Sequence, residues 1–72
     1  MKKYAVIDWK NGDRFEDIFD TEQEALNAAE YQWNHLTEKE HQDREFFAVM
    51  RGDLDEDGCF DLDTALLVKS YK

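Results

Sequence analysis

Residues 21–36 (TEQEALNAAEYQWNHL) constrain the fold more than any other part of the sequence. Apolar residues recur here every three or four positions, which is the period of an amphipathic helix. Thr21 and Glu24 have the spacing of a capping box, so the helix begins at this threonine. The early apolar positions are alanines, which lets the helix lie close on a sheet. The apolar stripe comprises Ala25, Ala29, Trp33 and Leu36, widened by Leu26 and Ala28.

Strand-like segments precede the helix. Residues 4–9 (YAVIDW) are rich in β-branched and aromatic side chains, and residues 14–20 repeat that character. The Asn-Gly pair at positions 11–12 is the strongest short signal for a type I′ hairpin turn. A two-residue turn fixes the register of the hairpin, with Trp9 opposite Arg14.

Three more segments follow the helix. Residues 37–43 predict a short helical turn or a continuation of the helix after a kink, and residues 45–51 (EFFAVMR) and 64–71 (TALLVKSY) predict strands. The order ββαββ predicts an α+β, two-layer fold, with a four-stranded, mainly antiparallel sheet and one main helix on one face. Residues 1–72 contain no proline and no linker, so we expect a single small domain.

One helix cannot cover both faces of a four-stranded sheet, so the second face has two interpretations. In the first interpretation this face is an interface, because exposed aromatic patches usually mark one. In the second, the 37–43 segment and the acidic loop after residue 52 fold over this face. The candidate residues for this second face are Tyr4, Val6, Trp9, Phe15, Phe47, Val49 and Tyr71. The candidate interaction residues are Tyr4, Trp9, Trp33 and Phe47.

The charge balance limits the partners. The chain has 18 acidic and 9 basic residues, a formal net charge of −9, which disfavours direct binding to nucleic acids and anionic membranes. It permits basic surfaces and cations, or it simply keeps a small protein soluble. A lone cysteine, Cys59, fits a reducing cytoplasm, and no apolar run approaches the ~20 residues of a membrane span. We therefore expect a cytoplasmic protein.

Residues 53–64 (DLDEDGCFDLDT) resemble a calcium-binding loop of the EF-hand type. Asp53, Asp55, Asp57 and Asp61 occupy positions 1, 3, 5 and 9 of that loop, so they are the candidate calcium ligands. Thr64 stands where a bidentate glutamate should close the site, and the flanking segments predict strands rather than helices. The alternative is a solvated acidic turn, since Asp and Gly suit tight backbone geometry.

The candidate catalytic residues do not form a convincing set. His35 and His41 are six positions apart, which is not the spacing of a helical metal pair. Cys59 lies among carboxylates, which disfavour its thiolate. We therefore expect a protein that is not an enzyme and needs no cofactor.

Three segments together resemble small, uncharacterised acidic proteins of low-GC Gram-positive bacteria, often encoded on mobile elements. The segments are YAVIDW (4–9), FDTEQEALNAAEYQWNHLTEKE (19–40) and DEDGCFDLDTALLVKSY (55–71), of which residues 33–40 are the most recognisable. The group has no established activity, so the resemblance carries over no functional residue. It implies one context, because mobile elements often carry acidic proteins that imitate the charge of DNA.

The sequence thus favours a non-enzymatic protein–protein interaction module, either a homodimer or an accessory subunit of another protein. The alternative is an acidic mimic that occupies a basic nucleic-acid-binding groove, and the third hypothesis is a weak calcium-binding loop. The mimic would use Asp53, Asp55, Glu56, Asp57, Asp61 and Asp63.

Overall fold

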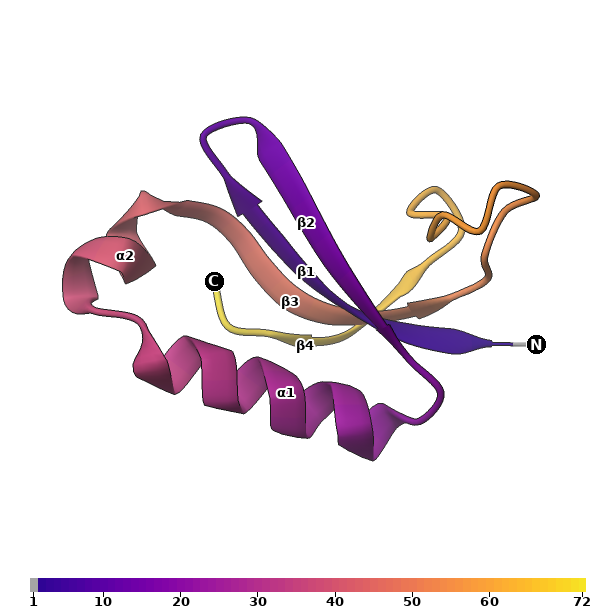
Figure 1. Ribbon diagram of the computed structural model, residues 1–72, viewed down its shortest axis with the longest axis horizontal. Helices are drawn as coiled ribbons and strands as arrows, with labels where there is room; N and C mark the ends of the chain where they lie inside the picture. Colours follow the sequence, from indigo (N-terminus) through magenta and orange to yellow (C-terminus); the bar gives the residue numbers. More distant parts are fainter. Residues whose placement is uncertain (1) are drawn as a thin grey trace.

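The computed structural model describes residues 2–72 and confirms the α+β fold. Four strands form one antiparallel sheet in the order β2-β1-β3-β4, and the main helix packs on one side of it (Figure 1). None of the helices within residues 2–72 is long and apolar enough to cross a membrane. The elements are β1 (Lys3–Lys10), β2 (Asp13–Phe19), α1 (Glu22–His35), α2 (Glu38–Asp43), β3 (Arg44–Gly52) and β4 (Leu66–Ser70).

The β1–β2 hairpin has the register that its turn predicts. Asn11 and Gly12 both adopt positive φ, at 51° and 83°, as a type I′ turn requires. Trp9 lies opposite Arg14, and Ala5 lies opposite Ile18. Because side chains alternate along a strand, this register decides which residues of the hairpin share a face.

Capping side chains define where both helices begin. The Thr21 hydroxyl accepts a hydrogen bond from the Glu24 N–H at 3.2 Å and donates to Oε1 of Glu24 at 2.9 Å. Thr37 and Glu40 complete a reciprocal capping box at α2, with bonds of 3.0 and 3.2 Å. The predicted short helical turn over residues 37–43 is thus confirmed as α2.

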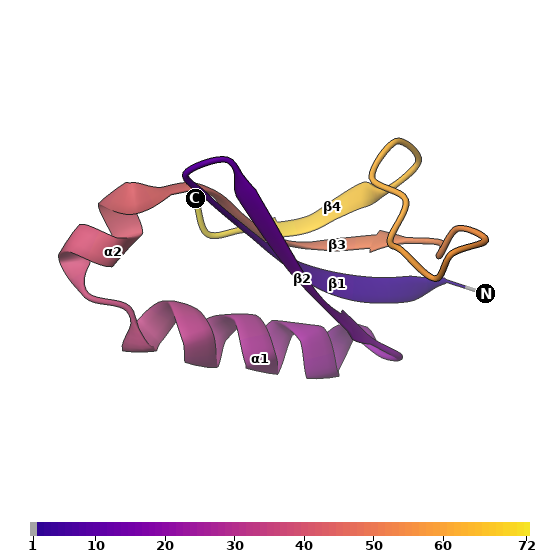
Figure 2. The same ribbon diagram turned by 45° about the horizontal axis from the view of Figure 1, so that its top comes forward.

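The side of the sheet that α1 covers is named the helix face. Its core consists of Val6, Phe47 and Val49 from the strands, with Ala25 and Ala29 from the helix. Both alanines are fully buried, so the helix backbone lies close to the sheet. Figure 2 shows α1 running along this side.

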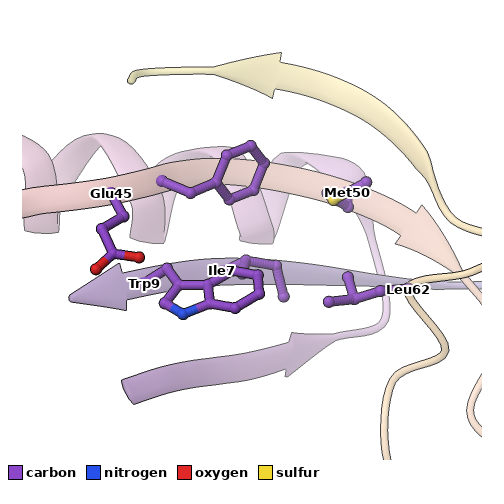
Figure 3. A pocket seen from close by; sticks show the side chains of 6 residues that line it. Ile7, Trp9, Glu45, Met50 and Leu62 are labelled. Atoms are coloured by element: carbon purple, nitrogen blue, oxygen red, sulfur yellow. The ribbon is translucent and has the colours of Figure 1, made fainter. Parts of the chain in front are cut away.

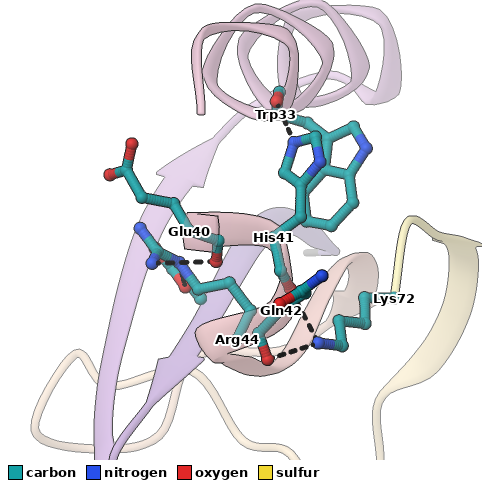
Figure 4. Close-up of polar contacts among 7 residues, drawn as sticks. Trp33, Glu40, His41, Gln42, Arg44 and Lys72 are labelled. Atoms are coloured by element: carbon teal, nitrogen blue, oxygen red, sulfur yellow. Dashed lines mark hydrogen bonds and ion pairs between the residues drawn. The ribbon is translucent and has the colours of Figure 1, made fainter. Parts of the chain in front are cut away.

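The helix face closes at the C-terminal end of α1. The His41 ring stacks on Trp33 with their centroids 3.9 Å apart, and its Nε2–H donates to the Trp33 carbonyl at 2.7 Å. Lys72 Nζ donates to the carbonyls of His41 and Gln42 at 2.7 and 2.8 Å, so the chain end after β4 is fastened to α2 (Figure 4). These contacts hold the polar segment α2 against the domain.

A largely buried ion pair also lies near α2. Arg44 Nε is 2.9 Å from Oδ1 of Asp8, and the Arg44 side chain is 9% exposed. Removing either charge alone would leave the other buried and unpaired, which is far costlier than losing an exposed pair.

The opposite side of the sheet, named the loop face, is covered in part by residues 53–65. Phe60 from this loop packs on Ala5 and Ile7 of β1, with Leu62 and Ala65 beside it. Of the two expected covers, the acidic loop folds over this face, whereas α2 stacks on Trp33 on the helix side.

The expected membership of the second face was wrong for six of the seven residues. Only Trp9 lies on the loop face, which it shares with Ala5 and Ile7. Phe15 lies opposite Asp8 in the hairpin, so it is on the helix face, where it is exposed. The other five form or contact the core under α1: Tyr4, Val6, Phe47, Val49 and Tyr71.

Candidate functional site

The acidic loop folds as a tight turn on a single apolar anchor. Leu54 and Phe60 form a β-bridge, and the Asp55 N–H donates to the Cys59 carbonyl at 2.7 Å. Gly58 takes the positive φ of 82° that the turn requires. Phe60 is only 3% exposed, so it is the residue that attaches the loop to the sheet.

Two of the six loop carboxylates, those of Asp55 and Asp61, accept hydrogen bonds from the loop's own backbone. Oδ1 of Asp55 accepts from the N–H groups of Asp57 and Cys59, both at 2.9 Å. Asp61 accepts from the Asp63 N–H at 3.0 Å. Such contacts are the usual reason for aspartates in turns.

Asp53 is held by a base outside the loop. Lys2 Nζ donates to its carboxylate at 2.9 Å, and this hydrogen bond lowers the pKa of Asp53 below its ordinary value. The Lys2–Asp53 pair ties the start of the loop to the residue just before β1.

The four candidate calcium ligands are not brought together. Within residues 2–72, no three His, Cys, Asp or Glu side chains gather in an arrangement that could hold a metal ion. The physical reason is that Asp55 and Asp61 bond to neighbouring N–H groups while Asp53 binds Lys2. The geometry of the described residues therefore does not strengthen the ligand set Asp53, Asp55, Asp57 and Asp61, which stays a prediction.

A groove of about 360 Å³ remains open on the loop face. In Figure 3, Trp9 and Glu45 lie at one end of it and Leu62 and Met50 at the other, with Ile7 between them. Trp9 is 36% exposed although it belongs to a central strand. The lining residues are Ile7, Trp9, Glu45, Phe46, Met50 and Leu62.

Two glutamates fix the boundaries of this groove. Glu16 on β2 accepts from the Phe60 N–H at 3.4 Å, which holds the loop over one part of the face. At the other end, Glu45 accepts from the Gly12 N–H at 3.2 Å, which ties the start of β3 to the hairpin turn. The β1–β3 register shifts beside Trp9, next to Glu45.

The predicted interaction residues are distributed over both faces. Phe47 is 1% exposed in the core, and Tyr4 and Trp33 pack against the same core on the helix face. Only Trp9 lines the groove. Sequence reasoning missed Phe46, Met50 and Leu62, because the β1–β3 pairing that places Phe46 opposite Trp9 and Met50 opposite Ala5 is not fixed by the hairpin turn.

The residues considered for catalysis lie in separate environments. His35 stacks on Tyr31 with centroids 4.1 Å apart, and its Nδ1 is 2.7 Å from the Tyr31 carbonyl. His41 is engaged by Trp33, and Cys59 is an exposed free thiol in the loop. Each of these side chains has a local structural role or faces solvent.

Comparison of the chain with protein-family models, with curated proteins and with solved structures finds no match. The resemblance to small acidic proteins of Gram-positive mobile elements therefore stays a prediction.

Proposed function

We propose that this protein is a non-enzymatic, cytoplasmic interaction module that binds a segment of another protein in the groove of the loop face. The observation that carries the proposal is an open, mainly apolar groove on a sheet whose other face is closed by a helix. Trp9 offers a large, half-exposed ring, and aromatic anchors of this kind dominate binding energies. Met50 supplies a flexible side chain that adapts to a ligand.

The charge of the protein defines the partner. Glu45 lines one end of the groove, and Leu62 at the other end lies between Asp61 and Asp63 in the sequence. With a net charge of −9, an acidic segment would be repelled and a basic one attracted. The ligand is therefore a segment with a large apolar side chain close to Lys or Arg.

Two further observations support the non-enzymatic, cytoplasmic assignment. Among the described residues that line the groove, Glu45 is the titratable one, and its Oε1 already accepts from Gly12. The free, exposed thiol of Cys59 suits a reducing compartment. The acidic-mimic alternative stays a prediction that the geometry does not strengthen, because three of its six carboxylates are engaged within the chain.

A peptide selection tests the proposal. Random peptides displayed on phage are selected against the protein, and the binders are mapped by backbone and methyl NMR shifts. We expect peptides that combine apolar and basic residues, with shifts at Ile7, Phe46 and Met50. Met50→Glu should abolish binding, whereas Phe15→Ser, at an exposed position outside the groove, should retain it. Acidic consensus peptides, or shifts confined to the helix side, would refute the proposal.

A further inference from the structure

The two edges of the sheet differ sharply in charge. β2 (DRFEDIF) contains Asp13, Glu16 and Asp17, and charged residues on an edge strand prevent pairing with other chains. β4 (LLVKS) contains no acid and lies in the longest acid-free run of the sequence, residues 64–72. In a chain with a net charge of −9, this edge is where another acidic surface meets least repulsion.

β4 also exposes two neighbouring leucines. Leu66 is 67% exposed and Leu67 is 57% exposed. Because consecutive side chains of a strand point to opposite faces, an exposed leucine stands on each side of this edge. Lys69, which could protect the edge, is directed to its own domain: its Nζ is 3.6 Å from Oε1 of Glu30 and 5.0 Å from the Tyr71 ring centroid.

We propose that two copies of this chain associate through the outer edge of β4, with their β4 strands antiparallel. Within residues 2–72, β3 is the strand that pairs with β4, so the other edge offers its backbone N–H and carbonyl groups. The partner is a second copy because β4 contains no acid and its Lys69 is paired with Glu30 of the same chain, so two β4 edges meet as apolar strands without opposed carboxylates.

The geometry of this dimer leaves the groove free. Antiparallel pairing of identical strands places a two-fold axis perpendicular to the sheet, so the same face of each copy points to the same side. The groove lies on β1 and β3 and the loop, away from the outer edge of β4. The dimer would therefore present two grooves on one side of a continuous sheet. This inference does not rest on the proposed ligand of the groove.

The interface is small, because β4 has five residues. Interfaces well below about 1,000 Å² are generally weak, so the dimer should become populated only as the protein concentration approaches the millimolar range. Since both copies are acidic, added salt should strengthen association by screening their repulsion. This salt dependence is opposite to that expected for a basic ligand in the groove.

Sedimentation equilibrium of the full chain, from micromolar to millimolar protein at low and high salt, tests the inference. The wild type should approach twice the 8.6 kDa mass of one chain, and more so at high salt. Leu67→Lys should raise the dissociation constant by at least about ten-fold, because it places like charges at the shared edge. Phe15→Lys is the matched control, since it puts the same charge at an exposed position of β2 and should leave the constant within about two-fold.

Circular dichroism checks that both variants fold, and hydrogen exchange at two protein concentrations gives a second measurement. In the wild type, protection of the β4 amides should rise with concentration while protection of the β2 amides does not. A wild type that stays monomeric at millimolar concentration and high salt overturns the inference. A dimer that Phe15→Lys weakens as much as Leu67→Lys, or β4 protection independent of concentration, overturns it as well.

Discussion

The two faces of the sheet carry similar apolar side chains but receive different covers. The helix face lies under the 14-residue helix α1, whose Ala25 and Ala29 are fully buried. The loop face lies under an irregular segment in which Phe60 is the one fully buried anchor, with Leu62 and Ala65 packed less deeply beside it. One face is closed as a result, and the other keeps a groove.

This difference follows from how each cover satisfies its backbone. A helix bonds its own N–H and carbonyl groups, so a whole stripe of side chains is free to pack on the sheet. The acidic loop instead uses Asp55 and Asp61 to bond its N–H groups, which leaves few side chains for packing. An irregular cover of this composition therefore protects a small area and leaves the rest open to a ligand.

The largest expected effect is at Phe47, the biggest fully buried side chain of the helix face. Phe47→Ala removes its contacts with Trp33 and Tyr71 and leaves a cavity. We expect a loss of about 3–5 kcal/mol in the free energy of unfolding, which is most of the stability of a small domain. Urea unfolding measures it. The control Phe15→Ala, at an exposed position, should change this value by less than about 0.5 kcal/mol.

Phe60→Ala should cost less, although Phe60 is almost as buried as Phe47. The loop can settle or admit water, so we expect a loss of about 2–3 kcal/mol, at or below the lower end for such a change. Hydrogen exchange should quicken over residues 53–65 and remain slow in α1. If Phe60→Ala destabilises the domain as much as Phe47→Ala, and opens both covers together, the two faces are not independent.

Gly52→Ala tests how closely the loop lies on the end of β3. A Cβ at this position would lie 3.1 Å from Cζ of Phe60 and 3.2 Å from Cβ of Ala65. The loop must then shift by a few tenths of an ångström, and we expect a loss of about 1 kcal/mol. The double variant Gly52→Ala/Phe60→Ala should lose less than the sum of the single variants. Simple additivity would show that Phe60 does not limit the space.

Much of the fold follows from local patterns in the sequence. The Asn11-Gly12 turn fixed the hairpin register, and the Thr21–Glu24 spacing located the start of α1. These features depend on residues that are close in the chain, where backbone sterics and capping bonds decide the outcome. The predicted apolar stripe on residues 21–36 likewise includes Ala25 and Ala29, the two buried residues of α1.

The candidate site depended on pairing between distant segments. Whether Phe47 or Phe46 faces the helix is decided by the β1–β3 register, which joins residues about 40 positions apart. In a strand that is apolar on both faces, the alternation of hydrophobicity does not distinguish them. The loop was predicted as acidic, but its apolar residues Phe60 and Leu62 determine where it packs.

The smallest expected effect concerns acid, which should loosen α2 and the acidic loop. Hydrogen bonding from the Thr37 backbone lowers the pKa of Glu40 in α2, and hydrogen bonding from Lys2 lowers the pKa of Asp53 in the loop. A carboxyl group with a lowered folded-state pKa stabilises the fold above its ordinary pKa, and this stability is lost as pH falls through the folded value. The loss should therefore begin near pH 4.5 for Glu40 and pH 3.8 for Asp53.

Urea midpoints measured from neutral pH down to this range separate the contribution of α2 from that of the loop. Glu40→Gln keeps a side chain that can complete the capping box but removes the carboxyl group that titrates. The urea midpoint of this variant should therefore fall less steeply with acid than that of the wild type. Lys2→Met leaves Asp53 in place but removes the donor that lowers its pKa, so the midpoint should fall less steeply with acid in the slightly lower pH range where Asp53 titrates. Both groups are exposed, so each change is small and 1 M salt should reduce the part due to Lys2. If the dependence of the midpoint on acid is the same in both variants as in the wild type, neither α2 nor the loop is stabilised by its carboxylate.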